Sequence, residues 1–412
     1  LALKIIQQSL KQLEDLGHEY RLEGFMWHQG ENDMFNEEYM ANYGKNLKHF
    51  LTRWRTDLKT PGLHFYIGEL CTKTIWGMDL RPRMYAISLG QKEVATNDKL
   101  AQYVPTSHVG VEIGGGVGLH YHYGTLGQLE HGENYAAAYL QNIGVDAEPG
   151  ATKHKLRKLP YTKRNPVKLF IMAGHRNMEG ERAFTQELAD LENYKHLLEP
   201  QEKVAYQYNL GGGYRTSQGW EAMRPAGYYD NFGPEVSFAA EISQHSREQI
   251  AIAKFTHSGS QIIDWTPEGS LAKTRHLYPA FIEFVKQSHQ SLKDKGYDVE
   301  IAGIFYHLGE NDMSFYPYRK DAAGRLQAIV NQSRLDLKLS ELNWYVSQQP
   351  PTDDERVNQI DVVSMVKAIA EKDSHLHHIK VFDLPAQEKK LVITTAGILH
   401  LGKSIADFYL AQ

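Results

Sequence analysis

The spacing of apolar residues predicts that strands and helices alternate along much of the chain. Four continuous apolar runs are typical of buried strands. They span residues 167–174, 250–255, 301–309 and 343–349. Residues 278–295 and 358–372 have apolar positions at helical spacing instead. Because this alternation favours a parallel sheet covered on both faces, we expect an α/β fold with its active site beyond the carboxyl ends of the strands.

The beginning of the chain also predicts a helix. Leu3, Ile6, Leu10 and Leu13 recur at helical spacing, and Gly17 follows as a C-cap. We therefore expect the chain to open inside a packed helix. Its first residue is not Met, and no basic segment precedes an apolar core as in a signal peptide. This start is typical of a processed or truncated piece of a longer protein.

The sequence contains an internal repeat. Residues 1–59 align without a gap with residues 280–338, and 18 positions are identical. The strongest stretch pairs GFMWHQGENDM, which starts at Gly24, with GIFYHLGENDM, which starts at Gly303. A second match, in the same order, places HYGTLGQLEHG (His122 to Gly132) on VITTAGILHLG (Val392 to Gly402). We interpret the chain as two copies of one domain.

The repeat predicts the domain organisation. The first copy, residues 1–145, has no equivalent of residues 166–279, whereas the second copy, residues 166–412, is whole. Residues 146–165 are rich in Pro, Gly and Lys and are expected to form a solvated linker. An incomplete first copy would expose a sheet edge and apolar surface, so we expect an upstream segment or other protein chains to complete it.

Composition and charge exclude several classes of protein. Lys and Arg number 45 against 50 for Asp and Glu, a net charge of -5, which gives no electrostatic footprint for nucleic acid. No apolar run approaches the ~18 residues of a membrane span. The single cysteine, Cys71, excludes an internal disulfide and a thiolate metal cluster. The histidines at 375, 377 and 378 match no zinc-ligand spacing, and the glycine triplets at 114–116 and 211–213 are interpreted as turns, so we expect no metal and no cofactor.

The motifs resemble a known family. Gly-Glu-Asn-Asp at residues 30–33 and 309–312 resembles the third block of SGNH hydrolases, and the wider WHQGEND resembles their sialate O-acetylesterase and acetylxylan-esterase branch. VKLFIMAGHRNMEG (Val167 to Gly180) is similar to the nucleophile block of that branch, and FGPEVSFAAEI (Phe232 to Ile242) to its glycine block. The resemblance implies two tandem SGNH-like, flavodoxin-like three-layer α/β/α domains. It also implies a periplasmic or extracellular protein that acts on carbohydrate.

The chemistry implied by the resemblance is serine esterolysis. A Ser attacks an acetyl ester, a His moves the proton, and an acid orients the His. A Gly amide and an Asn side chain stabilise the oxyanion. In the second copy, Gly233 and Asn311 occupy these two oxyanion positions, but Arg176, Val392 and Lys389 replace the Ser, the His and the acid. We therefore expect the second copy to be catalytically degenerate, because neither Arg nor Val can perform these steps.

The first copy keeps more of the pattern. His122 occupies the position of the base and Asn32 that of the oxyanion donor, but Leu119 replaces the acid. Glu31 or Glu112 could orient the imidazole, and His120 is a rival base. No serine within residues 1–145 lies in a G-x-S-N context. His28, His307, Asn32 and Asn311 also have an alternative interpretation as hydrogen-bonded structural residues, and His122 as a loop residue.

Two hypotheses about function follow. In the first, the protein is an O-acetylesterase of carbohydrates whose second copy is inactive. In the second, it is a non-catalytic structural or carbohydrate-binding subunit of a larger assembly. Arg176 could bind the carboxylate of an acidic sugar. Its alternative interpretation is an ion pair with a local acid such as Glu179 or Glu181.

Overall fold

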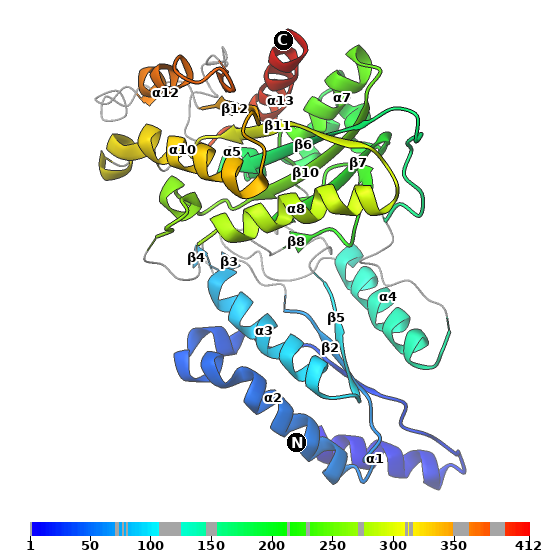
Figure 1. Cartoon of the computed structure of the whole chain (residues 1–412). Coiled ribbons are helices and arrows are strands. Elements are labelled where there is room, and N and C mark those ends of the chain that lie inside the picture. The colour runs from blue at the N-terminus through cyan, green and yellow to red at the C-terminus, as the bar shows by residue number, and fades with distance from the viewer. Residues whose placement is uncertain are drawn as a thin grey trace. The chain divides into compact units, whose positions relative to one another are not determined.

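The computed structural model divides the chain into two compact units, Leu1–Lys153 (unit 1) and His154–Gln412 (unit 2) (Figure 1). The structure describes the following residues: 2–70, 74–75, 78–79, 81–106, 125–145, 155–211, 215–227, 231–270, 276–309, 312, 316–348, 362–379 and 392–412. Both units combine helices with parallel strands, which confirms the expected α/β fold class. No helix in these ranges is long and apolar enough to cross a bilayer.

Unit 1 is built on a three-stranded parallel sheet in the order β1-β2-β5, formed by Phe25–Trp27, Phe65–Gly68 and Ala101–Val104. Two short strands, β3 (Thr74–Ile75) and β4 (Met78–Asp79), form a separate antiparallel pair. The helices are α1 (Ala2–Asp15), the 3-10 turn η1 (Asn32–Phe35), α2 (Glu37–Asp57), α3 (Arg81–Asn97) and α4 (Thr125–Asn142).

Unit 2 is built on a larger sheet with the strand order β13-β12-β11-β6-β10-β7-β8, and β9 also pairs with β7. The pairs from β13 to β7 are parallel, whereas β8 and β9 are antiparallel to β7. The strands are β6 (Val167–Gly174), β7 (Gln201–Leu210), β8 (Arg215–Thr216), β9 (Glu221–Met223), β10 (Gln249–Thr256), β11 (Val299–His307), β12 (Trp344–Ser347) and β13 (Leu376–His378).

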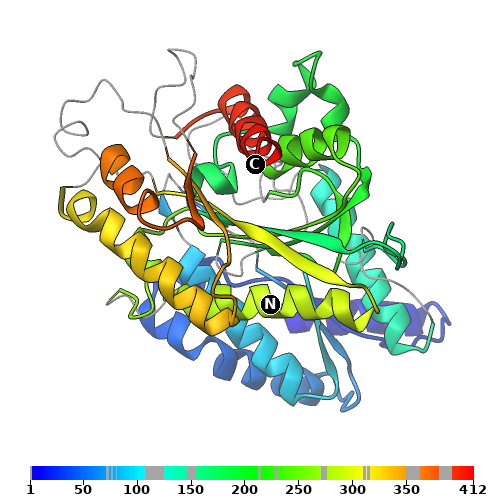
Figure 2. The ribbon, with the colours of Figure 1, turned by 45° about the horizontal axis from the view of Figure 1, so that its top comes forward.

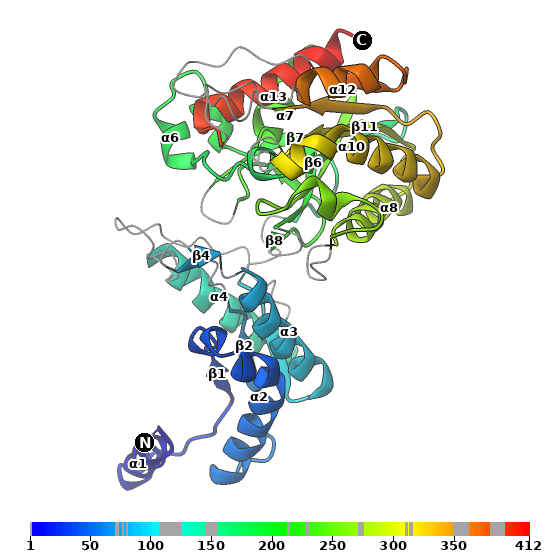
Figure 3. The ribbon, with the colours of Figure 1, turned by 90° about the vertical axis from the view of Figure 1, so that its left-hand side faces the viewer.

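Helices cover both faces of this sheet (Figures 2 and 3). Phe170 of β6 packs against Phe238 of α7 (Glu235–His245) and Tyr409 of α13 (Thr395–Leu410) on one face. Phe255 of β10 packs against Phe281 of α8 (Tyr278–Asp294) on the other. Unit 2 is therefore a three-layer α/β/α domain. Its helices are α5 (Arg176–Glu179), α6 (Thr185–Ala189), η3 (Lys195–Leu198), α7 (Glu235–His245), η4 (Ile262–Trp265), α8 (Tyr278–Asp294), α10 (Tyr316–Leu337), α12 (Val362–Ala370) and α13 (Thr395–Leu410).

The pairing of β1 with β2 in unit 1 has the same register as the pairing of β11 with β12 in unit 2. Phe25 lies opposite Phe65, and Ile304 and Trp344, which lie 279 residues further along the chain than these two residues, also lie opposite each other. The backbone conformation agrees as well: Lys59 and Lys338, an aligned pair, have φ of 54° and 57°, although residues other than Gly rarely adopt positive φ.

A partly buried arginine network also recurs in the two units, around the aligned residues Arg55 and Arg334. Arg55 donates to the Leu63 carbonyl at 3.0 Å and pairs with Asp98 at 2.6 Å. In unit 2, Arg334 donates to the Leu342 carbonyl at 3.0 Å and pairs with Asp373 at 2.5 Å. Each guanidinium thereby joins the end of a helix to the loops around the next two strands. The aligned segments are thus held by the same contacts.

Two regions differ from the sequence-based expectation. Helix α1 forms and Gly17 follows it at φ 75°, but α1 contains no buried residue, so the expected packed helix is not packed. The described part of the expected linker is not simply solvated, because Leu159 and Tyr161 are buried in the core of unit 2. The Tyr161 hydroxyl also accepts from the Ala205 amide at 2.9 Å. The segment packs on the core despite its lysines, because burying Leu159 and Tyr161 removes their apolar surface from water.

Candidate functional site

Arg176 begins helix α5 directly after the carboxyl end of the central strand β6. Its Nε donates to the Ser258 carbonyl at 3.3 Å and lies 3.7 Å from a Glu181 carboxylate oxygen. Glu181 also accepts from the Ser258 hydroxyl at 2.5 Å. Because 36% of the Arg176 side chain stays exposed, this ion pair with a local acid leaves part of the guanidinium open to solvent.

Gly233, at the expected oxyanion position, lies next to a buried ion pair. Its amide donates to Glu235 Oε1 at 3.1 Å, and the other oxygen of Glu235 lies 2.6 Å from Lys254 Nζ. The side chains of Lys254 and Glu235 are 0% and 1% exposed. A Cβ on Gly233 would lie 2.3 Å from the backbone carbonyl oxygen of Met178, so only glycine fits there. The Gly233 amide is therefore engaged inside the protein.

His175 lies one residue before Arg176 and is fully buried. Its Nε2 lies 2.6 Å from the Tyr306 hydroxyl, and its Nδ1 lies 3.0 Å from the Ser260 carbonyl. These partners fit a neutral imidazole that carries its proton on Nδ1, with the Tyr306 hydroxyl donating to Nε2. Burial lowers the pKa of His175 to about 4. His175 thus ties the turn after β6 to the neighbouring loops as a neutral ring.

The third motif block places two more buried titratable groups at this edge. His307 ends β11, and burial lowers its pKa to about 3. Asp312 accepts from the Ile262 amide at 2.8 Å through Oδ2, whereas its buried Oδ1 has no hydrogen-bond partner. Burial raises the pKa of Asp312 to about 7. Asn311, the expected oxyanion side chain, lies outside the described residues.

Val392 lies near the turn that carries Arg176. The amide of the next residue, Ile393, donates to the buried side chain of Asn177, which follows Arg176, at 3.0 Å. The fold therefore brings Val392, which aligns with His122, to the edge at which Arg176 lies, although 216 residues separate Asn177 and Ile393 along the chain. Lys389, at the expected acid position, lies outside the described residues.

Unit 1 presents its motif residues at the carboxyl end of β1. Asn32 is exposed at the start of η1, and Glu31 is its N-cap residue. Glu31 Oε1 lies 3.7 Å from His28 Nε2. Burial lowers the pKa of His28, although the charge of Glu31 opposes this shift. His122 lies outside the described residues, as do Leu119, His120 and Glu112.

Comparison with known proteins assigns the family. The model of the carbohydrate esterase, sialic acid-specific acetylesterase family matches residues 3–141 and 166–411. The chain belongs to this carbohydrate esterase family. The match confirms the resemblance of the motif blocks, and it covers both units.

The solved structures that match the chain have low sequence identity to it. A protein of Arabidopsis thaliana is 19% identical over 60% of this chain and 99% of its own, with a TM-score of 0.45. A carbohydrate acetylesterase from Xanthomonas citri is 14% identical over 59% and 57%, with a TM-score of 0.41. The protein NanS is 12% identical over 61% and 100%, also at 0.41. No curated protein sequence matches the chain.

Sequence reasoning missed one cluster in the first segment of this esterase-family chain. The rings of His28 and His131 lie 4.7 Å apart, and the ring of Tyr135 lies 4.6 Å from that of His131. All three side chains surround Gly68, where a Cβ would lie under 3.0 Å from each. The signal was present, since His131 and Tyr135 lie four residues apart on one face of α4.

The described residues contain no group of three or more His, Cys, Asp or Glu side chains that could hold a metal ion. His375 and His377 each lie 3.1 Å from the Asn343 side-chain oxygen, and His377 stacks on Tyr345. These two histidines therefore have polar and aromatic partners at the edge of the sheet.

Proposed function

We propose that unit 2 is a non-hydrolytic domain of the carbohydrate esterase family that binds carbohydrate. Arg176 carries this proposal. It occupies the turn after β6, where the family pattern requires the nucleophilic serine, and its Nε donates to Ser258. A guanidinium stays protonated at any working pH and cannot attack an ester.

Two further features support the loss of hydrolysis in unit 2. The Gly233 amide donates to the buried carboxylate of Glu235, so it is not free to stabilise an oxyanion. Val392 replaces the histidine and has no group that can accept a proton. Lys389 stands at the acid position in the sequence. Restoring a serine alone would therefore not restore the reaction.

The ligand class follows from the family and from Arg176. The family acts on carbohydrate esters, so O-acetylated carbohydrate is the first class of ligand. The exposed part of the Arg176 guanidinium suits the carboxylate of an acidic sugar, which can take two parallel hydrogen bonds from it. Glu181 competes for the same cation at 3.7 Å, so the acidic sugar must displace or share this contact.

Two assays test the proposal. A serine-reactive organophosphonate is incubated with the whole protein, intact mass reports labelling, and peptide mass mapping locates the label; we expect none within residues 166–412. Labelling of any serine within residues 166–412 would overturn the non-hydrolytic assignment. Binding of a sialylated oligosaccharide is then compared between the parent chain, Arg176→Ala and Arg157→Ala, a control basic residue outside the site. Equal affinity of all three would refute the role of Arg176.

A second candidate function is O-acetyl ester hydrolysis at unit 1, with the two units as copies of one domain. Its supporting observation is that Asn32 lies exposed after β1, beside Glu31 and His28. His122 is the proposed base and Glu31 its orienting acid, and the acyl nucleophile would be a serine outside residues 1–145, because no serine within them lies in a G-x-S-N context. Asn32→Ala should then lower hydrolysis of an O-acetylated sugar ~100–1000-fold, whereas the aligned Asn311→Ala should leave it unchanged. Equal effects of the two variants would contradict this assignment.

A further inference from the structure

A pocket lies at the border of the unit 2 sheet, between β13, α12 and α13. It has a volume of about 710 Å³, which is within the range of small-molecule sites. We call it the edge pocket. None of its lining residues belongs to the motif blocks. They include His377 and His378 of β13, Lys367, Ala370 and Glu371 of α12, and Phe408 of α13.

A column of stacked rings ends at this pocket. Phe305 of β11, Tyr345 of β12 and His377 of β13 stack with centroids 4.5 and 4.7 Å apart and with planes 7° and 16° from parallel. These distances match the spacing of about 4.8 Å between neighbouring strands, so the column crosses the sheet. Among the described strands, none pairs with β13 on its other side. One face of the His377 ring therefore covers Tyr345, and the other is turned to the pocket.

The His377 ring is held in place. Its Nε2 donates to the side-chain oxygen of Asn343 at 3.1 Å, and the ring of Phe408 stands beside it at 6.4 Å and 61°. Burial lowers the pKa of His377, so the ring is neutral at neutral pH. A fixed, neutral ring offers a flat surface that loses little conformational freedom when a ligand stacks on it.

The rim of the edge pocket is polar. Lys367 Nζ and Glu371 Oε1 lie 3.8 Å apart, and both side chains are 65% exposed. An exposed pair of this kind contributes little to stability, so a ligand can replace it at low cost. The ammonium donates and the carboxylate accepts, which suits two adjacent hydroxyl groups. Because the two charges cancel, the rim favours a neutral ligand over a phosphate or a carboxylate.

The corresponding part of unit 1 has no such ring surface. Gln102 of β5 lies opposite Tyr66 of β2, at the place that His377 has in unit 2. Ala138 of α4 lies 270 residues before Phe408, the offset at which α4 and α13 align. The two rings that border the edge pocket are thus particular to unit 2.

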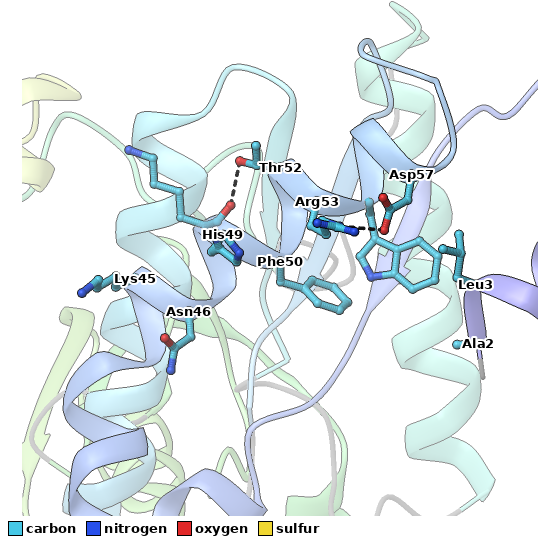
Figure 4. Close-up of a pocket in the computed structure, with 11 residues that line it drawn as sticks. Ala2, Leu3, Lys45, Asn46, His49, Phe50, Thr52, Arg53 and Asp57 are labelled. Carbon is cyan, nitrogen blue, oxygen red and sulfur yellow. Dashed lines mark hydrogen bonds and ion pairs between the residues drawn. The ribbon is translucent and has the colours of Figure 1, made fainter.

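The volume of a cavity alone does not distinguish the edge pocket. A groove between α1 and α2 in unit 1 is larger, at about 890 Å³ (Figure 4). Its rings, Phe50 and Trp54, stand at 69° to each other, so they form no stacked column. Its charged residues Arg53 and Asp57 are already paired at 2.9 Å. The stacked face of His377 is what the groove lacks.

We propose that the edge pocket binds a neutral pyranose ring of a carbohydrate. The C–H face of the sugar stacks on His377 beside Phe408, and two adjacent hydroxyl groups bond to Lys367 and Glu371. A peptide strand is a poorer occupant, because β13 has three residues and offers few backbone hydrogen bonds. This site is additional to the one proposed at Arg176, and either can fail without the other.

Calorimetric titration of the whole chain tests the proposal. The probes are xylopentaose and cellopentaose, neutral sugars whose equatorial hydroxyl groups leave flat C–H faces. We expect His377→Ala to weaken binding about 5–10-fold, the usual contribution of a stacked ring. His375→Ala is the matched control and should leave the affinity unchanged. His375 also lies 3.1 Å from the side-chain oxygen of Asn343, but it does not line the pocket.

NMR of the parent chain supplies a second measurement that needs no variant. Cellopentaose should shift the ring protons of His377 more than those of His375. Failure of both sugars to bind, or equal affinity of the parent chain and His377→Ala, would overturn the proposal. Loss of binding in Arg176→Ala but not in His377→Ala would assign the sugar to the other site. Shifts of the His377 ring with an aromatic tripeptide, but with neither sugar, would assign the pocket to peptide.

Discussion

The buried pair of Lys254 and Glu235 makes a strong prediction about the stability of unit 2. Lys254 Nζ and Glu235 Oε2 lie 2.6 Å apart, and both side chains are at most 1% exposed. Replacing Lys254 by Met keeps most of the side-chain volume but leaves the carboxylate buried without its cation. Removing one partner of a buried pair typically costs ~3–5 kcal/mol.

The structure indicates where in this range the cost should fall. Glu235 keeps the hydrogen bonds from the Gly233 amide at 3.1 Å and from the Tyr206 hydroxyl at 3.4 Å. Two remaining donors partly compensate the charge, so we expect Lys254→Met to cost about 3 kcal/mol. The double variant Lys254→Met with Glu235→Gln should cost only about 1 kcal/mol, because the amide is neutral and can still accept from Gly233.

Exchange of the β10 amides measures these costs within unit 2 alone, without assuming that the whole chain unfolds in one step. A loss of about 3 kcal/mol corresponds to exchange about 100-fold faster. Lys403→Met is the control, because Lys403 is 40% exposed and its pairs with Glu241 and Asp407 should contribute less than about 1 kcal/mol. Equal effects of Lys254→Met and Lys403→Met, or a double variant as unstable as Lys254→Met, would refute the reasoning.

Three further predictions concern stability. Arg55→Met and Arg334→Met should each destabilise their own unit by about 2–4 kcal/mol, because each arginine forms an ion pair and donates to two carbonyls. Hydrogen exchange at the Phe65 and Trp344 amides measures the two effects. A loss of stability from only one of the two variants would contradict the prediction. Asp312 keeps its proton up to a pH of about 7, so unit 2 should lose up to about 4 kcal/mol between about pH 4 and 7, and urea unfolding of Asp312→Asn should lack this loss. Burial lowers the pKa of His307 to about 3, so unit 2 should also lose stability as the pH falls below about 6.5, because the unfolded chain then binds a proton that the folded chain does not. His307→Gln should reduce this loss.

The strands that the sequence predicted are those buried on both faces. Val167–Gly174 begins and ends where the apolar run does, and the run at 250–255 lies inside β10. Such strands show a continuous apolar signal, because helices cover both of their sides. The sequence did not predict β7. Polar residues at its beginning interrupt the apolar pattern, and it pairs with the short antiparallel strands β8 and β9. Pairing at the border of a sheet depends on distant segments rather than on local spacing.

The candidate site was predictable only in part. Gly-Glu-Asn-Asp, Arg176, Gly233 and Val392 are visible as positions in a motif, and their order predicts that they meet at one edge of the sheet. The partners of these residues were not visible in the same way. Glu181 was one of two acids offered for Arg176, and nothing local pointed to Glu235 as the partner of Gly233. The cluster of His28 and His131 also required residues that lie far apart in the chain.

The sequence by itself determined the α/β class, the internal repeat and the family, because apolar periodicity and short motifs are local properties of the chain. Only the tertiary structure decided which of the repeated apolar residues are covered: Leu13 and Leu292 have the same identity and the same helical setting, yet only Leu292 is buried. It also decided that Lys254 pairs with Glu235 in the core. Burial and pairing depend on what other segments place against a residue, and the local pattern does not contain that information.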